Sequence, residues 1–430
     1  MNRLTTILAL LLFFAAPMNA QHYTPAPENL QRRAEFEGFR LGIFIHWGIY
    51  STFAQGEWYL NSGIDQNEYA KAADAFYPHR FDARAWTAAF KDAGAKYVTF
   101  TTRHHDGFSM WDTATGNYNI VRATPFGRDV LRELSEACEA DGLRLHLYYS
   151  ILDWMREDYP AGGTGKAVGV TPKPDYDSYF DFMKRQIGEL LTGYGPIGGL
   201  WFDGYWDHKE ESFDWRMPEL YAFAHSLRPE VLIGNNHHLS PLEGEDFQMF
   251  ERDLPGENTA GFSGQEVSRL PLEMCQTMNG MWGYKVSDTD YKSADELIAL
   301  IVRAASKGSN LLLNIGPQPN GELPAAALQR LQSIGEWMRT FGESIYDTHK
   351  GDLAGDWGVS TRRDDTLYLH ILDRTAESVT VELERKPKSV SLLNNADCSW
   401  VYDRRTHTLK VDLPAHGNCV DLPLKIEKQH

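Results

Sequence analysis

Short apolar runs alternate with helical patterns between about residues 40 and 345. The runs are nearly continuously apolar, which is typical of strands covered on both faces; they span 41–46, 97–102, 143–150, 198–203, 231–235, 247–251, 272–278 and 309–315. Apolar residues at helical spacing predict helices over 81–93, 129–140, 176–191, 293–306 and 324–341.

This alternation predicts a (β/α)8 TIM-like barrel, with short or absent helices in the sixth and seventh units. A doubly wound open sheet is the alternative. No G-x-G-x-x-G follows the first predicted strand, so nothing supports a dinucleotide-binding form of that alternative.

After about residue 350 the runs become shorter, richer in β-branched residues and partly alternating. They cover 366–372, 378–383, 389–393, 408–413 and 419–426, with polar turns between them. This pattern predicts a small C-terminal antiparallel β-sandwich. We therefore expect a catalytic barrel over 21–348 and a β-sandwich domain over 349–430.

The first twenty residues are typical of a secretory signal peptide. Arg3 is their one charge, residues 7–16 are an apolar run, and Ala20 offers a small residue at the break. The run is too short to span a bilayer comfortably, and no Cys follows it to carry a lipid. We expect export to the periplasm or the medium, without a membrane anchor.

Charge and cysteine content narrow the class of protein. The chain has 42 basic and 59 acidic residues, a net charge of −17, which argues against nucleic acid as a partner. Cys138, Cys275, Cys398 and Cys419 are too scattered for a metal knuckle. A Cys398–Cys419 disulfide stays open, and so does the oligomeric state.

Polar and aromatic side chains gather where the predicted barrel strands end, which is where catalytic residues lie in such barrels. Asp203 ends an otherwise apolar strand and is the leading catalytic carboxyl, with Glu57, Asp106, Glu251 and Glu273 as candidates for a second. Glycoside hydrolysis needs two such carboxyl groups. Trp and Tyr beside them suit the apolar face of a sugar ring.

The histidines at these strand ends raise a metal-dependent hydrolase as an alternative. They are His46, His104, His105, His146, His237 and His238. However, no His-x-His ends the first strand, and no His-Glu-x-x-His occurs in the chain. We expect neither a metal nor another cofactor. A carbohydrate-binding barrel without catalysis is the other alternative.

Several motifs, in this order along the chain, resemble the α-L-fucosidases of glycoside hydrolase family 29. They are Gly42-Ile43-Phe44-Ile45-His46-Trp47-Gly48, Glu57-Trp58-Tyr59, Arg103-His104-His105-Asp106-Gly107-Phe108, Trp201-Phe202-Asp203-Gly204, Trp282-Gly283-Tyr284 and Gly308-Ser309-Asn310-Leu311-Leu312-Leu313-Asn314-Ile315-Gly316-Pro317. The resemblance implies a barrel followed by a sandwich. It also implies a metal-independent, retaining enzyme that removes terminal α-L-fucose from oligosaccharides or glycoconjugates.

The same resemblance implies roles for individual residues. Asp203 would be the nucleophile and Glu273 the acid/base, with Glu251 in reserve. The remaining matches would form the fucose pocket: Phe44, His46, Glu57, Trp58, His104, His105, Tyr148, Trp201 and Trp282, with His237 or Arg252 in place of an Arg found in many members.

Overall fold

The computed structural model describes residues 23–165, 168–169, 171–208, 210, 212–417 and 419–428. The predicted signal peptide, residues 1–20, lies outside these residues. In the part of the chain described, no helix combines the length and apolarity needed to cross a membrane.

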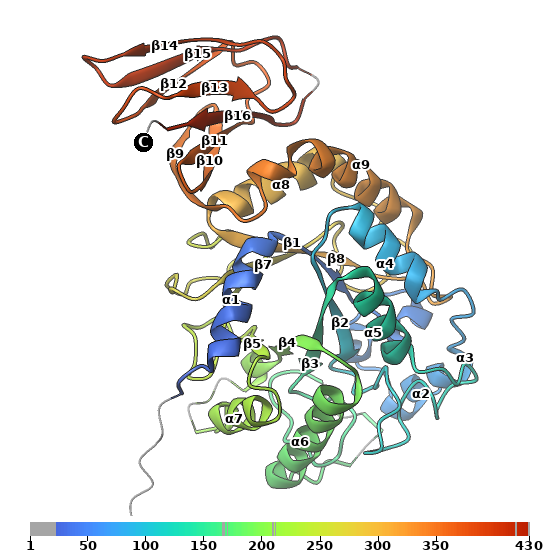
Figure 1. Ribbon diagram of the computed structural model, residues 1–430. Coiled ribbons are helices and arrows are strands. Elements are labelled where there is room, and N and C mark those ends of the chain that lie inside the picture. The colour runs from blue at the N-terminus through green and yellow to red at the C-terminus, as the bar shows by residue number, and fades with distance from the viewer. Residues whose placement is uncertain are drawn as a thin grey trace, which may run out of the picture.

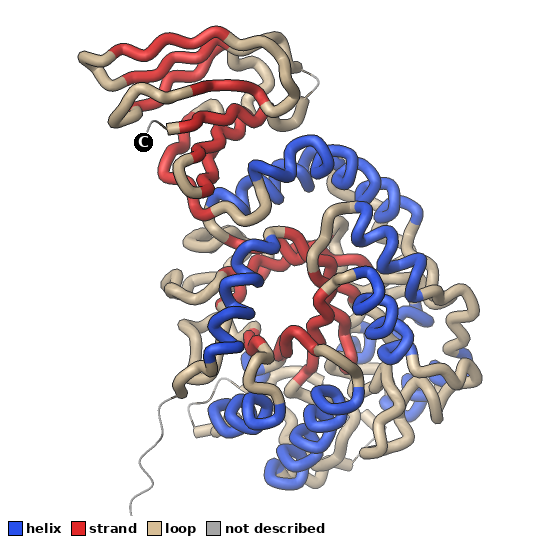
Figure 2. Tube along the Cα trace, in the orientation of Figure 1, coloured by secondary structure: helices blue, strands red, loops and turns tan. Residues whose placement is uncertain are grey.

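Eight parallel strands form a nearly closed barrel, which confirms the predicted fold and excludes the open doubly wound sheet. They are β1 (Leu41–Ile45), β2 (Tyr97–Arg103), β3 (Arg144–Ser150), β4 (Ile197–Asp203), β5 (Leu232–Asn235), β6 (Gln248–Glu251), β7 (Leu272–Thr277) and β8 (Ser309–Ile315). Their order is β5-β4-β3-β2-β1-β8-β7-β6. At the β5–β6 seam the backbone N–H of Asp246 donates to Ile233 O at 2.6 Å. Figure 2 shows the ring of strands with helices outside it.

The larger helices cover the barrel from outside (Figure 1). The helices are α1 (Pro27–Phe39), α2 (Gln66–Ala70), α3 (Ala72–Ala75), α4 (Ala83–Asp92), α5 (Val130–Asp141), α6 (Tyr176–Gly193), α7 (Met217–Leu227), α8 (Ala294–Ser306) and α9 (Ala325–Phe341). Among the described residues, β5 and β6 are followed by loops, whereas β7 is followed by α8; the predicted weak helix is therefore confirmed for the sixth unit and wrong for the seventh. Ser293 and Glu296 form a capping box at the start of α8.

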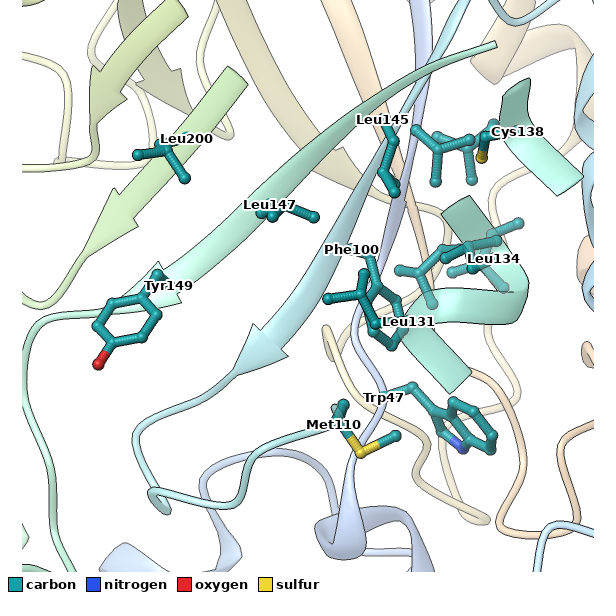
Figure 3. Packing of buried hydrophobic residues seen from close by; sticks show 14 of the residues in the cluster. Trp47, Phe100, Met110, Leu131, Leu134, Cys138, Leu145, Leu147, Tyr149 and Leu200 are labelled. Atoms are coloured by element: carbon teal, nitrogen blue, oxygen red, sulfur yellow. The ribbon is translucent and has the colours of Figure 1, made fainter. Parts of the chain in front are cut away.

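Alternation along the strands sends side chains to two separate apolar clusters. Outward-facing residues such as Phe100, Leu147 and Leu200 belong to the cluster that includes Leu131 and Leu134 of α5 (Figure 3). Inward-facing residues form a second cluster inside the barrel, made of Phe36, Phe44, Tyr97, Tyr148, Trp201, Leu232, Phe247, Met249, Cys275 and Leu312. The barrel interior is therefore a packed core.

The C-terminal region folds into two antiparallel sheets, as predicted. One sheet contains β13 (Ser389–Leu392), β16 (Leu422–Glu427), β11 (Thr366–Ile371), β10 (Gly358–Arg363) and β9 (His349–Gly355). The other contains β12 (Ser378–Glu382), β15 (Thr408–Asp412) and β14 (Ser399–Asp403). The sequence pattern missed β9, β10 and β14; β9 has no buried residue and so no alternation to detect. Cys398 and Cys419 are both free thiols, so the disulfide left open is not formed.

Candidate active site

A cavity of about 690 Å³ opens at the carboxyl ends of the barrel strands. It is lined by Phe44, His46, Glu57, Trp58, His104, His105, Tyr148, Trp201, Asp203, Trp206, Asn236, His238, Glu251, Arg252, Ala260, Phe262, Cys275 and Trp282. Nine of the ten predicted binding residues line this cavity, and only His237 does not. The strand-end rule therefore predicted most of the cavity lining.

Asp203 is the last residue of β4 and is oriented by donors on both carboxylate oxygens. Its Oδ1 accepts from the backbone N–H of Gly204 at 2.8 Å and from Trp206 Nε1 at 3.0 Å. Its Oδ2 accepts from the Tyr148 hydroxyl at 2.9 Å. Gly204 has a φ of +103°, and a Cβ there would lie 2.9 Å from Leu152. Only glycine fits this turn, which aims the Asp203 side chain into the cavity.

Burial and the charge of nearby Glu251 raise the pKa of Asp203 to about 6. The hydrogen bonds from Trp206 and Tyr148 oppose that shift because they stabilise the ionised form. Asp203 is therefore ionised at neutral pH but holds a proton more readily than an exposed Asp.

Glu251, the last residue of β6, shares a hydrogen-bond donor with Asp203. Asn236 Nδ2 lies 2.9 Å from Glu251 Oε2 and 3.4 Å from Asp203 Oδ1. This bridge limits the distance between the two carboxylates, and the limit is compatible with the roughly 5–5.5 Å that retaining glycosidases use. His238 Nε2 lies 3.2 Å from the same Glu251 oxygen.

Opposing effects set the pKa of Glu251. Burial raises it, but the hydrogen bonds from His238 and Asn236 outweigh burial and leave the pKa below its ordinary value. Because the charges of Asp203 and Glu251 interact, the two carboxyls lose their protons in two steps, and the pKa of each step belongs to the pair.

Glu273 does not lie where the resemblance placed it. It is the second residue of β7, 1% exposed, and pairs in register with Met249 in the barrel interior. In the same register Glu251 pairs with Cys275, two residues nearer the carboxyl ends. Two residues along a strand correspond to about 6–7 Å. Glu273 is therefore beneath the cavity and absent from its lining, whereas the reserve candidate Glu251 lines it.

His237 is the second predicted residue that the structure places elsewhere. Its Nε2 contacts Glu245 Oε1 at 2.9 Å, away from the cavity lining. The neighbouring His238 lines the cavity instead, with a left-handed φ of +62°. Residue spacing cannot reveal this left-handed backbone conformation, and the structure places His238 at the cavity where His237 was predicted.

His46, His104 and His105 are neutral hydrogen-bonding groups. Burial lowers the pKa of His46 to about 3, and burial with neighbouring positive groups lowers the pKa of His104 and His105 well below 6.5. His46 Nδ1 lies 2.6 Å from Asn314 Oδ1, and His105 Nδ1 lies 2.8 Å from Ser150 Oγ. His46 and His105 thus each have one ring nitrogen held by the protein.

A carboxyl and several aromatic rings complete the walls. Glu57 Oε2 accepts from the backbone N–H of Gly283 at 2.7 Å, and burial raises its pKa. Trp58 stacks on Trp206 at 5.5 Å between ring centroids. The Arg252 guanidinium lies 5.2 Å from the ring centroid of Trp282. Such a mixture of rings and fixed polar groups can bind one face of a sugar and its hydroxyls.

Some lining residues carried no assigned role in the sequence analysis. They are Trp206, Asn236, His238, Ala260, Phe262 and Cys275. Asn236 and His238 follow a strand end, so the strand-end rule could have found them. Arg252, the alternative to His237, lines the cavity. Ala260 and Phe262 lie in the loop between β6 and β7, which has no periodic pattern.

Among the residues that the structure describes, no group of three or more His, Cys, Asp or Glu side chains is arranged to hold a metal ion.

Comparisons with known proteins point to one family. The family model described as alpha-L-fucosidase matches residues 10–343. The chain is 30% identical over 415 residues to an alpha-L-fucosidase of Dictyostelium discoideum, covering 87% of this chain and 86% of that protein.

Solved structures agree. The structure of alpha-L-fucosidase isoenzyme 1 from Paenibacillus thiaminolyticus is similar with a TM-score of 0.84 and 35% identity, covering 94% of this chain and all of that one. A trapped covalent intermediate of a GH29 alpha-L-fucosidase from Bacteroides thetaiotaomicron, with 2-fluoro-fucosyl fluoride, has a TM-score of 0.80 and 26% identity, covering 95% and 98%.

Proposed function

The chain belongs to the α-L-fucosidases of glycoside hydrolase family 29, and from that membership we propose that it is an exo-acting, retaining enzyme that removes terminal α-L-fucose from oligosaccharides or glycoconjugates. The observation that carries the mechanism is the carboxyl pair Asp203 and Glu251, bridged by Asn236 on the cavity wall. We assign Asp203 as nucleophile and Glu251, in place of Glu273, as acid/base.

In the first step an Asp203 carboxylate oxygen attacks the anomeric carbon and the bond to the leaving oxygen breaks. For this step the proton of the coupled pair must lie on Glu251, which gives it to the leaving oxygen, so the leaving group departs as an alcohol. The product is a fucosyl ester of Asp203 with inverted configuration. The trapped intermediate of the Bacteroides thetaiotaomicron enzyme supports a covalent step of this kind.

In the second step Glu251, now ionised, takes a proton from water. The resulting oxygen attacks the anomeric carbon, the ester bond breaks, and Asp203 returns to a carboxylate. The second inversion restores the α configuration. The Tyr148 hydroxyl, a donor to Asp203 Oδ2, stabilises the carboxylate that leaves in this step.

The remaining lining residues fit the binding of one fucose ring. Neutral His46, His104 and His105 can exchange hydrogen bonds with hydroxyls, and Glu57 can accept from them. Phe44, Trp201 and Trp282 can cover the apolar side of the sugar, including a methyl group.

The proposal is tested first with an aryl α-L-fucoside and the full mature chain. We expect release of the aryl alcohol, and we expect NMR to detect α-L-fucose as the first-formed product. Activity should survive exhaustive chelation. Binding of fucose without release would favour the carbohydrate-binding barrel, loss of activity on chelation would favour a metal-dependent hydrolase, and β-fucose as first product would exclude retention.

The N-terminal segment supports export as part of the proposal, with the substrate outside the cytoplasm. N-terminal sequencing of the protein recovered from its native host should begin near Gln21. An intact Met1 on the recovered protein would contradict export by this signal.

Phe262 is expected to contribute on the leaving-group side of the cavity. Its side chain is 44% exposed and its ring centroid lies 5.4 Å from that of His238, which contacts Glu251. Replacing Phe262 by Ala should lower kcat/KM for a fucosylated oligosaccharide by about 3–10-fold, since aromatic contacts contribute about 0.5–1.5 kcal/mol. The rate with α-L-fucosyl fluoride, which has no leaving-group ring, should not change. Val286→Ala, at an exposed position outside the lining, is the control; equal losses with both substrates would contradict this role.

His238 is expected to tune the pH profile. Its hydrogen bond lowers the pKa of Glu251, so removing it should raise that pKa. Because Glu251 must be protonated in the first step, the basic limb of kcat/KM should move to higher pH by up to about one unit in His238→Asn. Asn tolerates the left-handed backbone at this position. His79→Asn, on the exposed surface, should leave the profile unchanged; a shift to lower pH in His238→Asn would contradict the assignment.

A further inference from the structure

Glu273 is held between two side chains that come from other strands across the barrel. The Tyr97 hydroxyl on β2 donates to Glu273 Oε2 at 2.6 Å. Trp201 Nε1 on β4 donates to Glu273 Oε1 at 2.8 Å. Both oxygens of this buried carboxyl are therefore used to connect β7 with β2 and β4 through the barrel interior.

One of these two contacts leads directly to the cavity. The indole of Trp201 lines the cavity, and it stacks on Tyr148 with 5.4 Å between ring centroids and 25° between planes. Tyr148 and Trp201 are also partners in the register of β3 and β4. Tyr148 in turn donates to Asp203. A rotation of the Trp201 ring would change both the cavity wall and the ring that carries this donor.

Hydrogen-bond chemistry makes Glu273 the group that fixes the ring. An indole N–H can only donate, so a buried Trp needs an acceptor at one defined point. The Glu273 oxygen supplies that acceptor on the side of Trp201 away from the solvent. Leaving the N–H without an acceptor would carry the cost of an unsatisfied buried donor and favour other ring orientations.

We propose that Glu273 is a positioning residue, which acts on the reaction through Trp201 and Tyr148 without touching the substrate. The inference rests on the proposed fucosidase activity and adds a role to a carboxyl that the two chemical steps do not use. It requires that kcat/KM depends on the hydrogen bond between Trp201 and Glu273 and does not depend on proton transfer by Glu273.

Two substitutions separate these requirements. Glu273→Gln keeps an oxygen that can accept from Trp201, while its amide can donate to the Tyr97 oxygen, but it cannot exchange a proton. Glu273→Asp keeps the ionisable carboxyl but is one methylene shorter and draws it away from Trp201. We expect Glu273→Gln to keep kcat/KM within about threefold and Glu273→Asp to lose about 10²-fold, the scale of a 1 Å misplacement. Losses should be equal for aryl fucosides with good and poor leaving groups.

A double-mutant cycle with Trp201→Phe tests the route of the effect. Once the indole N–H is gone, Glu273→Asp should cost little further activity, whereas independent roles would make the two losses add. Additive losses would overturn the proposal. An inactive Glu273→Gln that sodium azide restores would overturn it too, because that result marks an acid/base. If the wild-type chain releases no aryl alcohol, the proposed function is wrong and this inference falls with it. If the wild type is active but the losses are additive, or azide restores Glu273→Gln, only the inference is wrong.

Discussion

The Asp203→Asn variant is expected to lose turnover of an aryl α-L-fucoside by about 10⁴-fold or more, because an amide cannot form the covalent ester. The fold should survive. Asn has nearly the same shape, its oxygen can accept from Gly204 and Trp206, and its amide can donate to the Tyr148 oxygen.

The pH dependence of stability provides a control that does not involve substrate. Because the pKa of Asp203 is raised in the folded protein, the folded state binds this proton more tightly than the unfolded state. Wild-type stability contributed by Asp203 is therefore present at low pH and is lost as pH rises towards about 6. Asp203→Asn removes this loss. The melting temperature of the variant minus that of the wild type should therefore increase as the pH rises from 4 to 6.

Mass spectrometry tests the role of Asp203 directly. Incubation with 2-fluoro-fucosyl fluoride should add one fluorofucosyl group to the wild-type chain, on the peptide that contains Asp203, and none to Asp203→Asn. With Asp203→Ala, azide can attack the anomeric carbon from the vacated side in a single inversion, so β-L-fucosyl azide is the expected product. Labelling of another carboxyl in the wild type would contradict the assignment.

The sequence was sufficient for the barrel, the sandwich and most of the cavity wall because the signals there are local. Apolar strands followed by polar and aromatic residues predict side chains at one end of a barrel. Asp203 is the clearest case, since it ends an apolar run at the carboxyl end of a predicted strand.

For the acid/base, the motif resemblance and the position of a residue in its strand favour different glutamates. Glu251 ends β6, whereas Glu273 stands near the beginning of β7, and both face inward. The strand-end rule alone favours Glu251, but the resemblance to a Glu shortly before Trp282-Gly283-Tyr284 favoured Glu273. Which inward layer a residue occupies depends on the register between strands, and no spacing along one chain supplies it.

Loop residues were beyond prediction for a different reason. Asp253 Oδ1 accepts from the backbone N–H and the hydroxyl of Thr259 and from the N–H of Ala260, which shapes the loop that carries Phe262. These bonds are made between residues with no periodic pattern. The cavity rim thus depends on local polar contacts, whereas its floor depends on strand alternation.

Glu251→Ala is expected to give the second large effect, and the loss should depend on the leaving group. With a poor leaving group that needs a proton, kcat/KM should fall by about 10²–10⁴-fold. With a dinitrophenyl leaving group, which departs without protonation, the first step should remain fast and the fucosyl-enzyme should accumulate because no base activates water.

Azide then separates Glu251 from Glu273. As an anion it needs no general base, so it should restore turnover of the dinitrophenyl substrate by Glu251→Ala. It attacks the fucosyl-enzyme in a second inversion, so the product should be α-L-fucosyl azide, opposite to the product expected from Asp203→Ala. Glu273→Ala should give neither the leaving-group dependence nor the azide product, because its carboxyl lies in the barrel interior and bonds Tyr97 and Trp201. If Glu273→Ala forms α-L-fucosyl azide and Glu251→Ala does not, then Glu273 must reach the anomeric centre in the Michaelis complex, and the barrel interior must rearrange when substrate binds.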